Sequence, residues 1–149
     1  EKDVPISKEE ILRRKWLNEE EYEYLKKVSI ELYKKMYEKA NEAGFILADI
    51  KFEFGKNEKG EILLADSLGP DEFRLWPKEK YSEGKTQESF DKQPIRDWLI
   101  SIGYRDALEE ARKNNKPIPN PPELPDWLVK IVQQRYIEAY ERIANEKIF

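Results

Sequence analysis

Charged and apolar residues alternate along segment 45–54. If this segment is an extended strand, Asp49, Lys51 and Glu53 share one face at spacings of about 7 Å, because successive side chains point to opposite faces. Carboxylate oxygens are ligands that Mg²⁺ prefers, and a lysine between them offers a point charge to a phosphate or carboxylate. This pattern is typical of metal-assisted phosphoryl transfer. A row of solvent-exposed ion pairs on the face of a sheet would give the same sequence pattern. The apolar residues expected on the other face are Ile46, Ala48, Ile50, Phe52 and Phe54.

After a glycine-bounded loop over 55–60, the chain returns as a second apolar segment at 61–66. We expect the two segments to pair as an antiparallel hairpin. Strand parity then places Asp66 on the same face as the charged residues of the first strand. Beyond the following turn, Asp71 and Arg74 could pair with each other, or Arg74 could hold a ligand carboxylate in a bidentate fork.

A third group of candidates stands where a helix is expected to begin, at Asp91, Lys92 and Arg96. The N–H groups and the dipole at a helix N-terminus attract anions, and the two basic side chains add charge suited to a phosphate. An ordinary helix cap flanked by exposed basic residues is the competing interpretation.

The composition limits the chemistry that the chain can perform. Its 149 residues include no cysteine and no histidine, which excludes thiolate metal sites and Ser-His-Asp or Cys-His catalysis within it. Lys and Arg total 27 and Asp and Glu total 31, with the signs interspersed, so we expect no nucleic-acid partner. No run of about 18 apolar residues is present, so we expect no membrane span.

Along the chain, helices are expected both before and after the strands. Ser7, with Glu10 three residues later, predicts a capping box for a short helix, and Asn18 predicts the N-cap of a long one. Apolar residues then recur at three- and four-residue steps, and Gly44 stands where a glycine commonly ends a helix.

Shorter elements follow the hairpin. Residues 73–76 are a possible third strand, helices are expected over 93–102 and 105–114, and a proline-rich connector precedes a last helix over 126–145. Together the elements predict a single α+β domain over residues 1–149, with an antiparallel hairpin or sheet packed by the long helix and the C-terminal helices. The side chains expected on the inner face of the last helix are Leu128, Ile131, Val132, Tyr136, Ala139, Tyr140 and Ile143.

At these same segments the chain resembles the SAICAR synthetase family. Stretch 47–55, Leu-Ala-Asp-Ile-Lys-Phe-Glu-Phe-Gly, is similar to the family signature of Asp, any residue, Lys, an apolar residue, Glu, Phe and Gly. Stretches 70–76, 89–99 and 136–141 resemble further family segments in the same order and spacing. The resemblance covers residues 18–145 and implies the SAICAR synthetase-like ATP-binding fold without its N-terminal lobe.

The resemblance also implies a reaction, in which ATP and Mg²⁺ drive the joining of L-aspartate to carboxyaminoimidazole ribotide, giving SAICAR, ADP and phosphate. By position, Glu53 and Asp66 match residues that hold the metal and nucleotide. Lys51 matches a residue that contacts the phosphates or the reacting carboxylate. These three are the implied catalytic residues, and Asp49 with Lys51 is implied in cofactor binding.

On the substrate side, Arg74 matches a residue at the imidazole ribotide, and Lys92 and Arg96 match residues near the phosphate of that substrate. Asp71 and Asp91 belong to the same family-like segments and are implied to be substrate-binding residues.

Two departures from the family pattern bear on function. Ser67 stands where the family usually has Glu, and Gly69-Pro-Asp-Glu72 stands where it has Thr-Pro-Asp-Ser. Nothing in the chain matches the N-terminal half of the family. The resemblance therefore implies a C-terminal part that needs the N-terminal lobe as a partner and is nearly inactive alone, within a cytoplasmic, homodimeric enzyme.

Two other functions fit the residues. A non-catalytic nucleotide- or anion-binding module would keep the charged strand face, and the departure at Ser67 leaves that possibility open. A helix–sheet interaction domain would carry the same charges in contact with water only.

Overall fold

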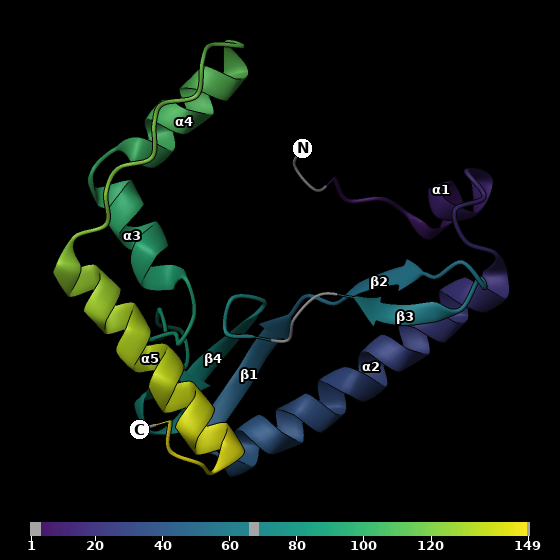
Figure 1. Ribbon diagram of the computed structural model, residues 1–149, viewed down its shortest axis with the longest axis horizontal. Coiled ribbons are helices and arrows are strands. Elements are labelled where there is room, and N and C mark those ends of the chain that lie inside the picture. Colours follow the sequence, from purple (N-terminus) through teal and green to yellow (C-terminus); the bar gives the residue numbers. More distant parts are fainter. Residues whose placement is uncertain (1–3, 66–68, 149) are drawn as a thin grey trace. The chain divides into compact units, whose positions relative to one another are not determined.

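The computed structural model describes residues 4–65 and 69–148 (Figure 1). It divides into two compact units, Glu1–Glu38 and Lys39–Phe149, and each is described by itself below. Along the chain the elements are α1 (Lys8–Arg13), α2 (Glu19–Glu42), β1 (Phe45–Ile50), β2 (Glu53–Lys56), β3 (Ile62–Ala65), β4 (Phe73–Pro77), a 3₁₀ turn η1 (Lys78–Lys80), α3 (Gln93–Ser101), α4 (Tyr104–Lys113) and α5 (Asp126–Ala144).

Side-chain caps begin both helices of the first unit. The Ser7 hydroxyl accepts a hydrogen bond from the Glu10 backbone N–H at 3.2 Å, at the start of α1. At α2, the Asn18 Oδ1 accepts from the Glu21 N–H at 2.8 Å, and Glu21 Oε2 accepts from the Asn18 N–H at 2.9 Å. These reciprocal bonds satisfy donors that a helix start leaves unpaired. The caps at Ser7 and Asn18 are confirmed, but the return bond of the capping box predicted at Ser7 is not seen among the described residues, because the Glu10 carboxylate accepts from Arg13 and Arg14 instead.

In the second unit, α2 ends at a left-handed glycine that α5 holds in place. Gly44 has φ +80°, which any side chain would make unfavourable. Arg142 of α5 donates to the Ala43 and Gly44 carbonyl oxygens at 3.0 and 3.1 Å, and its guanidinium lies 3.9 Å from the centre of the Phe45 ring. One arginine therefore joins the last helix to the point where α2 becomes β1.

Strands β1 and β4 form an antiparallel pair that carries the core of this unit. The register pairs Phe45 with Pro77, Leu47 with Leu75 and Ile50 with Phe73. Phe45 is 0% exposed, and its ring meets the Phe90 ring edge-on at 5.2 Å between centroids. The other buried core residues are Leu47, Leu75, Pro77, Phe73, Ala40, Ala111, Leu128 and Ala139.

The strand expected over 45–54 is broken, and its deeply buried face is not the predicted one. Strand β1 ends at Ile50, and a β-bulge shifts the register between Leu47 and Asp49. The extra residue lets Leu47 face the core while Asp49, two positions later, faces outward. Before the bulge the predicted apolar face is therefore wrong, because Phe45 and Leu47 are buried there instead of Ile46 and Ala48. From residue 49 on the prediction is confirmed: the charged positions are exposed and the apolar positions 50, 52 and 54 are half-buried.

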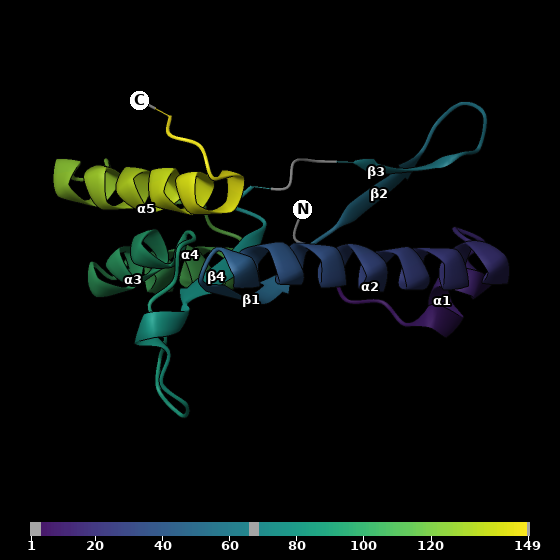
Figure 2. The ribbon, with the colours of Figure 1, turned by 90° about the horizontal axis from the view of Figure 1, so that it is seen from below.

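The predicted hairpin forms, but from β2 and β3. Their antiparallel register pairs Glu53 with Ala65 and Lys56 with Ile62, in a sheet separate from β1 and β4 (Figure 2). The predicted strand end at Asp66, with Ser67, lies outside the described residues.

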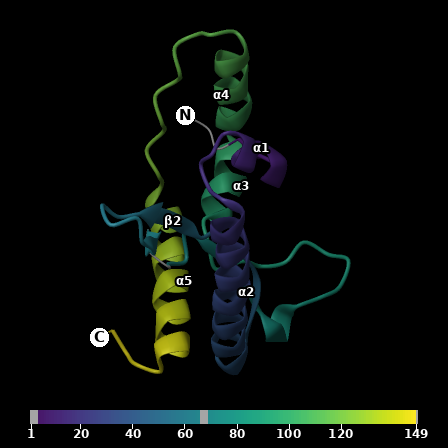
Figure 3. The same cartoon turned by 90° about the vertical axis from the view of Figure 1, so that its right-hand side faces the viewer.

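The three C-terminal helices form close to their predicted bounds, and an extended proline-rich connector joins α4 to α5 (Figure 3). On α5, Leu128 and Ala139 are buried, whereas Tyr140 is 46% exposed, so its predicted place on the inner face is wrong. Among the described residues, none of the helices combines the length and apolar character needed to cross a bilayer.

Candidate active site

Asp49 and Arg74 stand opposite each other on β1 and β4 and form a two-pronged ion pair. Arg74 donates from Nε to Asp49 Oδ1 at 2.6 Å and from Nη2 to Oδ2 at 2.7 Å. The Arg74 guanidinium holds the pKa of the Asp49 carboxyl below its usual range, against the opposing effect of burial, and the charge of Arg96 adds to this. The ion pair considered between Asp71 and Arg74 is therefore wrong: Arg74 pairs with Asp49, a partner that the sequence did not indicate, and Asp71 lies beside Lys92.

A second arginine–aspartate pair lies at the start of α3. The Asp91 side chain is 4% exposed. Its Oδ1 accepts from the Gln93 backbone N–H at 2.8 Å, and its Oδ2 lies 3.4 Å from Arg96 Nη1. Asp91 thus satisfies a backbone donor at the helix start, as the cap interpretation predicts, and also fixes an exposed arginine beside it.

The two pairs belong to one electrostatic group. The Arg96 charge helps to lower the pKa of Asp49, and the Asp91 charge adds to the Asp49 hydrogen bond in raising the pKa of Arg74. Each ion pair therefore favours the charged form of a group in the other. The structure therefore brings together predicted residues from three segments of the sequence.

The remaining predicted residues form two further pairs. Lys51 and Glu53 are ion-paired, both about half exposed, and the Lys51 backbone N–H donates to the Glu72 carbonyl at 2.9 Å. Lys92 Nζ lies 3.8 Å from Asp71 Oδ2, which is an ion pair without a hydrogen bond.

The predicted metal site is only half described, because Asp66 lies outside the described residues. Within the part of the chain that the structure describes, no group of three or more acidic side chains is placed to hold a metal ion. The register pairs Glu53 with Ala65, so strand parity gives the face of Glu53 to Ala65 and not to the following position, and only the residue types of Glu53 and Asp66 still suit a metal ion. Mg²⁺ is commonly held by one or two carboxylates together with substrate phosphates, which this pair of residues fits in its chemistry.

Two residues of α5 reach the site without having been predicted as site residues. Arg135 donates from Nη1 to the Ser89 carbonyl at 2.8 Å and from Nη2 to Glu88 at 3.3 Å, so it secures the loop that leads to Asp91. Burial raises the pKa of the Tyr136 hydroxyl, and the charges of Asp71 and Asp91 raise it further. Helical spacing indicated only that Tyr136 faces inward, and it gave no signal for Arg135.

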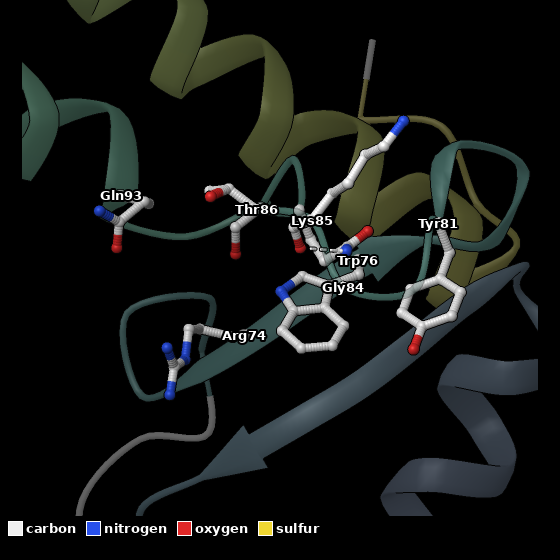
Figure 4. A pocket seen from close by; sticks show the side chains of 9 residues that line it. Arg74, Trp76, Tyr81, Gly84, Lys85, Thr86 and Gln93 are labelled. Carbon is white, nitrogen blue, oxygen red and sulfur yellow. Dashed lines mark hydrogen bonds between the residues drawn. The ribbon is translucent and has the colours of Figure 1, made fainter.

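A hollow of about 380 Å³ adjoins Arg74 (Figure 4). Its walls come from β4, from the loop after η1 and from the start of α3. Gln87 closes that loop on itself, because its side-chain amide accepts from the Ser82 N–H at 3.0 Å and donates to the Ser82 and Lys85 carbonyls at 2.6 Å each. The lining residues are Arg74, Trp76, Tyr81, Gly84, Lys85, Thr86, Gln87, Ser89 and Gln93.

The arginine and lysine side chains beside this hollow are of the kind that suits anionic groups, and they stand on an α+β scaffold. The family model for SAICAR synthetase matches residues 1–111, so the chain belongs to the SAICAR synthetase family. The chain is 45% identical over 148 residues to phosphoribosylaminoimidazole-succinocarboxamide synthase of Nitrosopumilus maritimus, covering 99% of this chain and 53% of that protein.

Solved structures of the same family share the fold. SAICAR synthase from Saccharomyces cerevisiae, in a complex with SAICAR, aligns with a TM-score of 0.73 and 35% identity over 97% of this chain and 44% of that one. A type-2 SAICAR synthetase solved with ADP aligns at a TM-score of 0.54 over 88% of this chain and 41% of that one; at 24% identity this supports the fold alone. The chain spans about half the length of the relatives it matches and corresponds to a C-terminal part.

Proposed function

We propose that this chain is the C-terminal part of an ATP-dependent ligase of purine biosynthesis that joins L-aspartate to carboxyaminoimidazole ribotide, giving SAICAR, ADP and phosphate. The observation that carries the proposal is the group formed by Asp49, Arg74, Asp91 and Arg96, which lies on the family-matching segments. The yeast relative was solved with SAICAR bound, which fits the proposed product.

The chemistry runs in two steps. A carboxylate oxygen of the ribotide attacks the γ-phosphorus of ATP, and ADP leaves. The aspartate amine then attacks the resulting acyl phosphate, the carbon–oxygen bond breaks, and phosphate departs as the nitrogen loses a proton. Both steps place negative charge on oxygen, so positioning and fixed positive charge are the main contributions that a protein can make.

The proposed roles follow the contacts of each residue. Lys51 supplies charge to the transferring phosphoryl group or to the reacting carboxylate, and Asp49 orients Arg74 toward the ribotide. Lys92 and Arg96 hold the ribotide phosphate, while Asp71 and Asp91 position these two cations. Glu53 and Asp66 would hold Mg²⁺, whose charge stabilises the phosphate oxygens when it is bound.

The proposal extends to the setting of the enzyme. The missing part of the nucleotide site comes from an N-terminal lobe, because the relatives are about twice as long as this chain. We also propose that the enzyme is cytoplasmic and that it is a homodimer. Sedimentation of the full-length gene product would measure the oligomeric state.

A coupled ADP-release assay on the full-length gene product tests the proposal. Glu53→Gln should lower kcat by roughly a hundredfold, because a charge at the phosphates is lost while the shape is kept. Glu58→Gln, an exposed glutamate in the loop between β2 and β3, is the matched control and should keep full activity. Equal activity of the two variants, both with unchanged melting temperature, would refute the assignment of Glu53.

The same preparation separates the ligase from a non-catalytic binding module. The ligase releases ADP only when both the ribotide and L-aspartate are present. A rise in melting temperature with ATP and Mg²⁺, but no ADP release with both substrates, would favour the binding module.

A further inference from the structure

The loop that leads into α3 is buried at three consecutive residues, Ser89, Phe90 and Asp91. A buried loop must find partners for its backbone polar groups within the protein. The Phe90 N–H donates to the Leu75 carbonyl of β4 at 2.9 Å, and the Ser89 carbonyl accepts from Arg135 Nη1 of α5 at 2.8 Å. The loop is therefore joined to the sheet by its own backbone and to the last helix by one arginine side chain.

Arg135 contacts this loop at two further points. Its Nη2 lies 3.3 Å from a carboxylate oxygen of Glu88, and its guanidinium lies 5.7 Å from the centre of the Phe90 ring. Arg142, seven residues later on the same face of α5, lies over Phe45, whose ring meets that of Phe90 edge-on. Helix α5 thus holds the segment 88–91 through a backbone carbonyl, a carboxylate and an aromatic ring.

The segment 88–91 in turn determines where α3 begins. Every residue of α3 is partly or fully exposed, so burial in the core does not fix the start of this helix. Asp91 instead accepts from the Gln93 N–H at 2.8 Å and lies 3.4 Å from Arg96 Nη1. The Arg96 side chain is 53% exposed, so a displacement of Asp91 would also displace this cation.

We propose that Arg135 is a positioning residue for the ribotide phosphate, acting through the segment 88–91 on Lys92 and Arg96. The inference rests on the proposed function, because that function assigns these two cations to the phosphate. Both terminal nitrogens of Arg135 are engaged by Ser89 and Glu88, so its effect on the phosphate passes through the loop. A cation that is held in place before the ligand arrives loses less conformational freedom when it binds. Arg135 therefore contributes to the affinity for the ribotide and not to the rate of the chemical steps.

Steady-state kinetics of the full-length gene product separate positioning from a general loss of stability. Arg135→Met removes the charged donors and keeps most of the apolar stem. It should raise the KM for the ribotide about tenfold, because hydrogen bonds from a charged group are lost, and leave kcat and the other two KM values within about twofold. Arg135→Lys keeps a charged donor for the Ser89 carbonyl, so its ribotide KM should return to within about threefold of that of the natural enzyme.

Arg142 provides the matched control on the same face of α5. Its guanidinium donates to the Ala43 and Gly44 carbonyls and not to the segment 88–91. Arg142→Met should lower the melting temperature and leave the ribotide KM unchanged. A ribotide KM raised equally by Arg142→Met and Arg135→Met would contradict the inference, as would an Arg135→Lys variant that is impaired as much as Arg135→Met.

Calorimetry without ATP tests whether the effect reaches the phosphate. The ligands are SAICAR and its riboside, which lacks the phosphate. Arg135→Met should weaken the binding of SAICAR about tenfold and leave the affinity for the riboside unchanged, because only SAICAR carries the group that Lys92 and Arg96 hold. An equal loss for both ligands would contradict an effect on the phosphate.

These measurements distinguish the inference from the proposed function. A full-length protein that binds SAICAR in an Arg135-dependent way, but releases no ADP with all substrates present, refutes the ligase and keeps the positioning role. An active ligase whose ribotide KM and SAICAR affinity are the same in Arg135→Met as in the natural enzyme refutes the positioning role and keeps the ligase.

Discussion

The geometry of the Arg74 guanidinium lets this one side chain contact Asp49 and the hollow at the same time. Its guanidinium carries several donors in a fixed plane, so it can hold Asp49 on one edge and present another N–H to the hollow. A lysine would place a single point charge and could not serve both partners in fixed directions. The pair with Asp49 is therefore best understood as orienting the arginine rather than neutralising it.

The Asp49–Arg74 pair predicts a pH-dependent stability. Because the folded-state pKa of Asp49 is lowered, the pair contributes stability above the unfolded-state pKa of about 3.9, and this is lost as pH falls through the folded-state value. Asp49→Asn should reduce the free energy of unfolding at pH 7 by about 0.5–1 kcal/mol, a small value because both side chains are half exposed. Urea unfolding at pH 7, 4 and 2.5 measures this difference, which should shrink at the lowest pH. A difference that stays constant across this range, or equals that of Glu58→Gln, would contradict the ion pair.

Tyr136 supplies a second prediction at this scale. Burial and the negative charges of Asp71 and Asp91 disfavour its phenolate, so its hydroxyl should stay protonated above the usual tyrosine pKa of about 10. The measurement is the difference in absorbance at 295 nm between the natural chain and Tyr136→Phe during an alkaline titration. A midpoint at or below the value of a free tyrosine would place Tyr136 away from these carboxylates.

At the scale of elements, Gly44 determines whether α2 can pass into β1. Its positive φ disfavours any side chain, and an added Cβ would lie 2.6 Å from Arg142 Nη2. Gly44→Ala should lower the free energy of unfolding by about 1–2 kcal/mol from backbone strain alone, and by more if Arg142 is displaced.

Two matched glycines separate the causes. Gly60 has φ +79° with open space around it, so Gly60→Ala measures the strain without the contact. Gly55 has open space and no positive φ, so Gly55→Ala should be nearly neutral. Denaturant unfolding of the three variants should rank Gly44→Ala as the most destabilised. Equal stability of the Gly44 and Gly55 variants would contradict this account of the junction.

The sequence predicted the elements whose signals are local. The caps at Ser7 and Asn18 and the glycine at position 44 each depend on residues within one turn, and the structure confirms all three. The bulge at Ala48 could not be predicted, because alternation of polar and apolar residues continues through it. It depends on how β4 pairs with β1, and this pairing joins segments that are far apart in the sequence.

The same distinction applies to the candidate site. Asp49, Arg74, Asp91 and Arg96 were found from residue types and family-like segments, and the structure places them in one group. Arg135 and the hollow were not found, because both depend on where α5 and the loop after η1 pack. Such contacts join residues up to 47 positions apart in the sequence.

For the whole molecule, the open question is how much of the enzyme this chain provides. It spans 53% of one relative, and the hairpin residues Leu63 and Leu64 are 52% and 39% exposed in the structure. A two-stranded hairpin is marginal by itself, and its apolar side chains are usually covered. We therefore expect the 149-residue chain alone to show less than about 1% of the turnover of the full-length gene product. Turnover close to that of the full-length enzyme would contradict this.

The central claim, that this family member activates a carboxylate by phosphoryl transfer, is tested most directly with ¹⁸O. The full-length gene product is given the ribotide labelled in both carboxylate oxygens, together with ATP, Mg²⁺ and L-aspartate, and the released phosphate is analysed by mass spectrometry. The account predicts one ¹⁸O in each phosphate and one ADP for each SAICAR formed. Unlabelled phosphate, or ADP released without SAICAR, would contradict it.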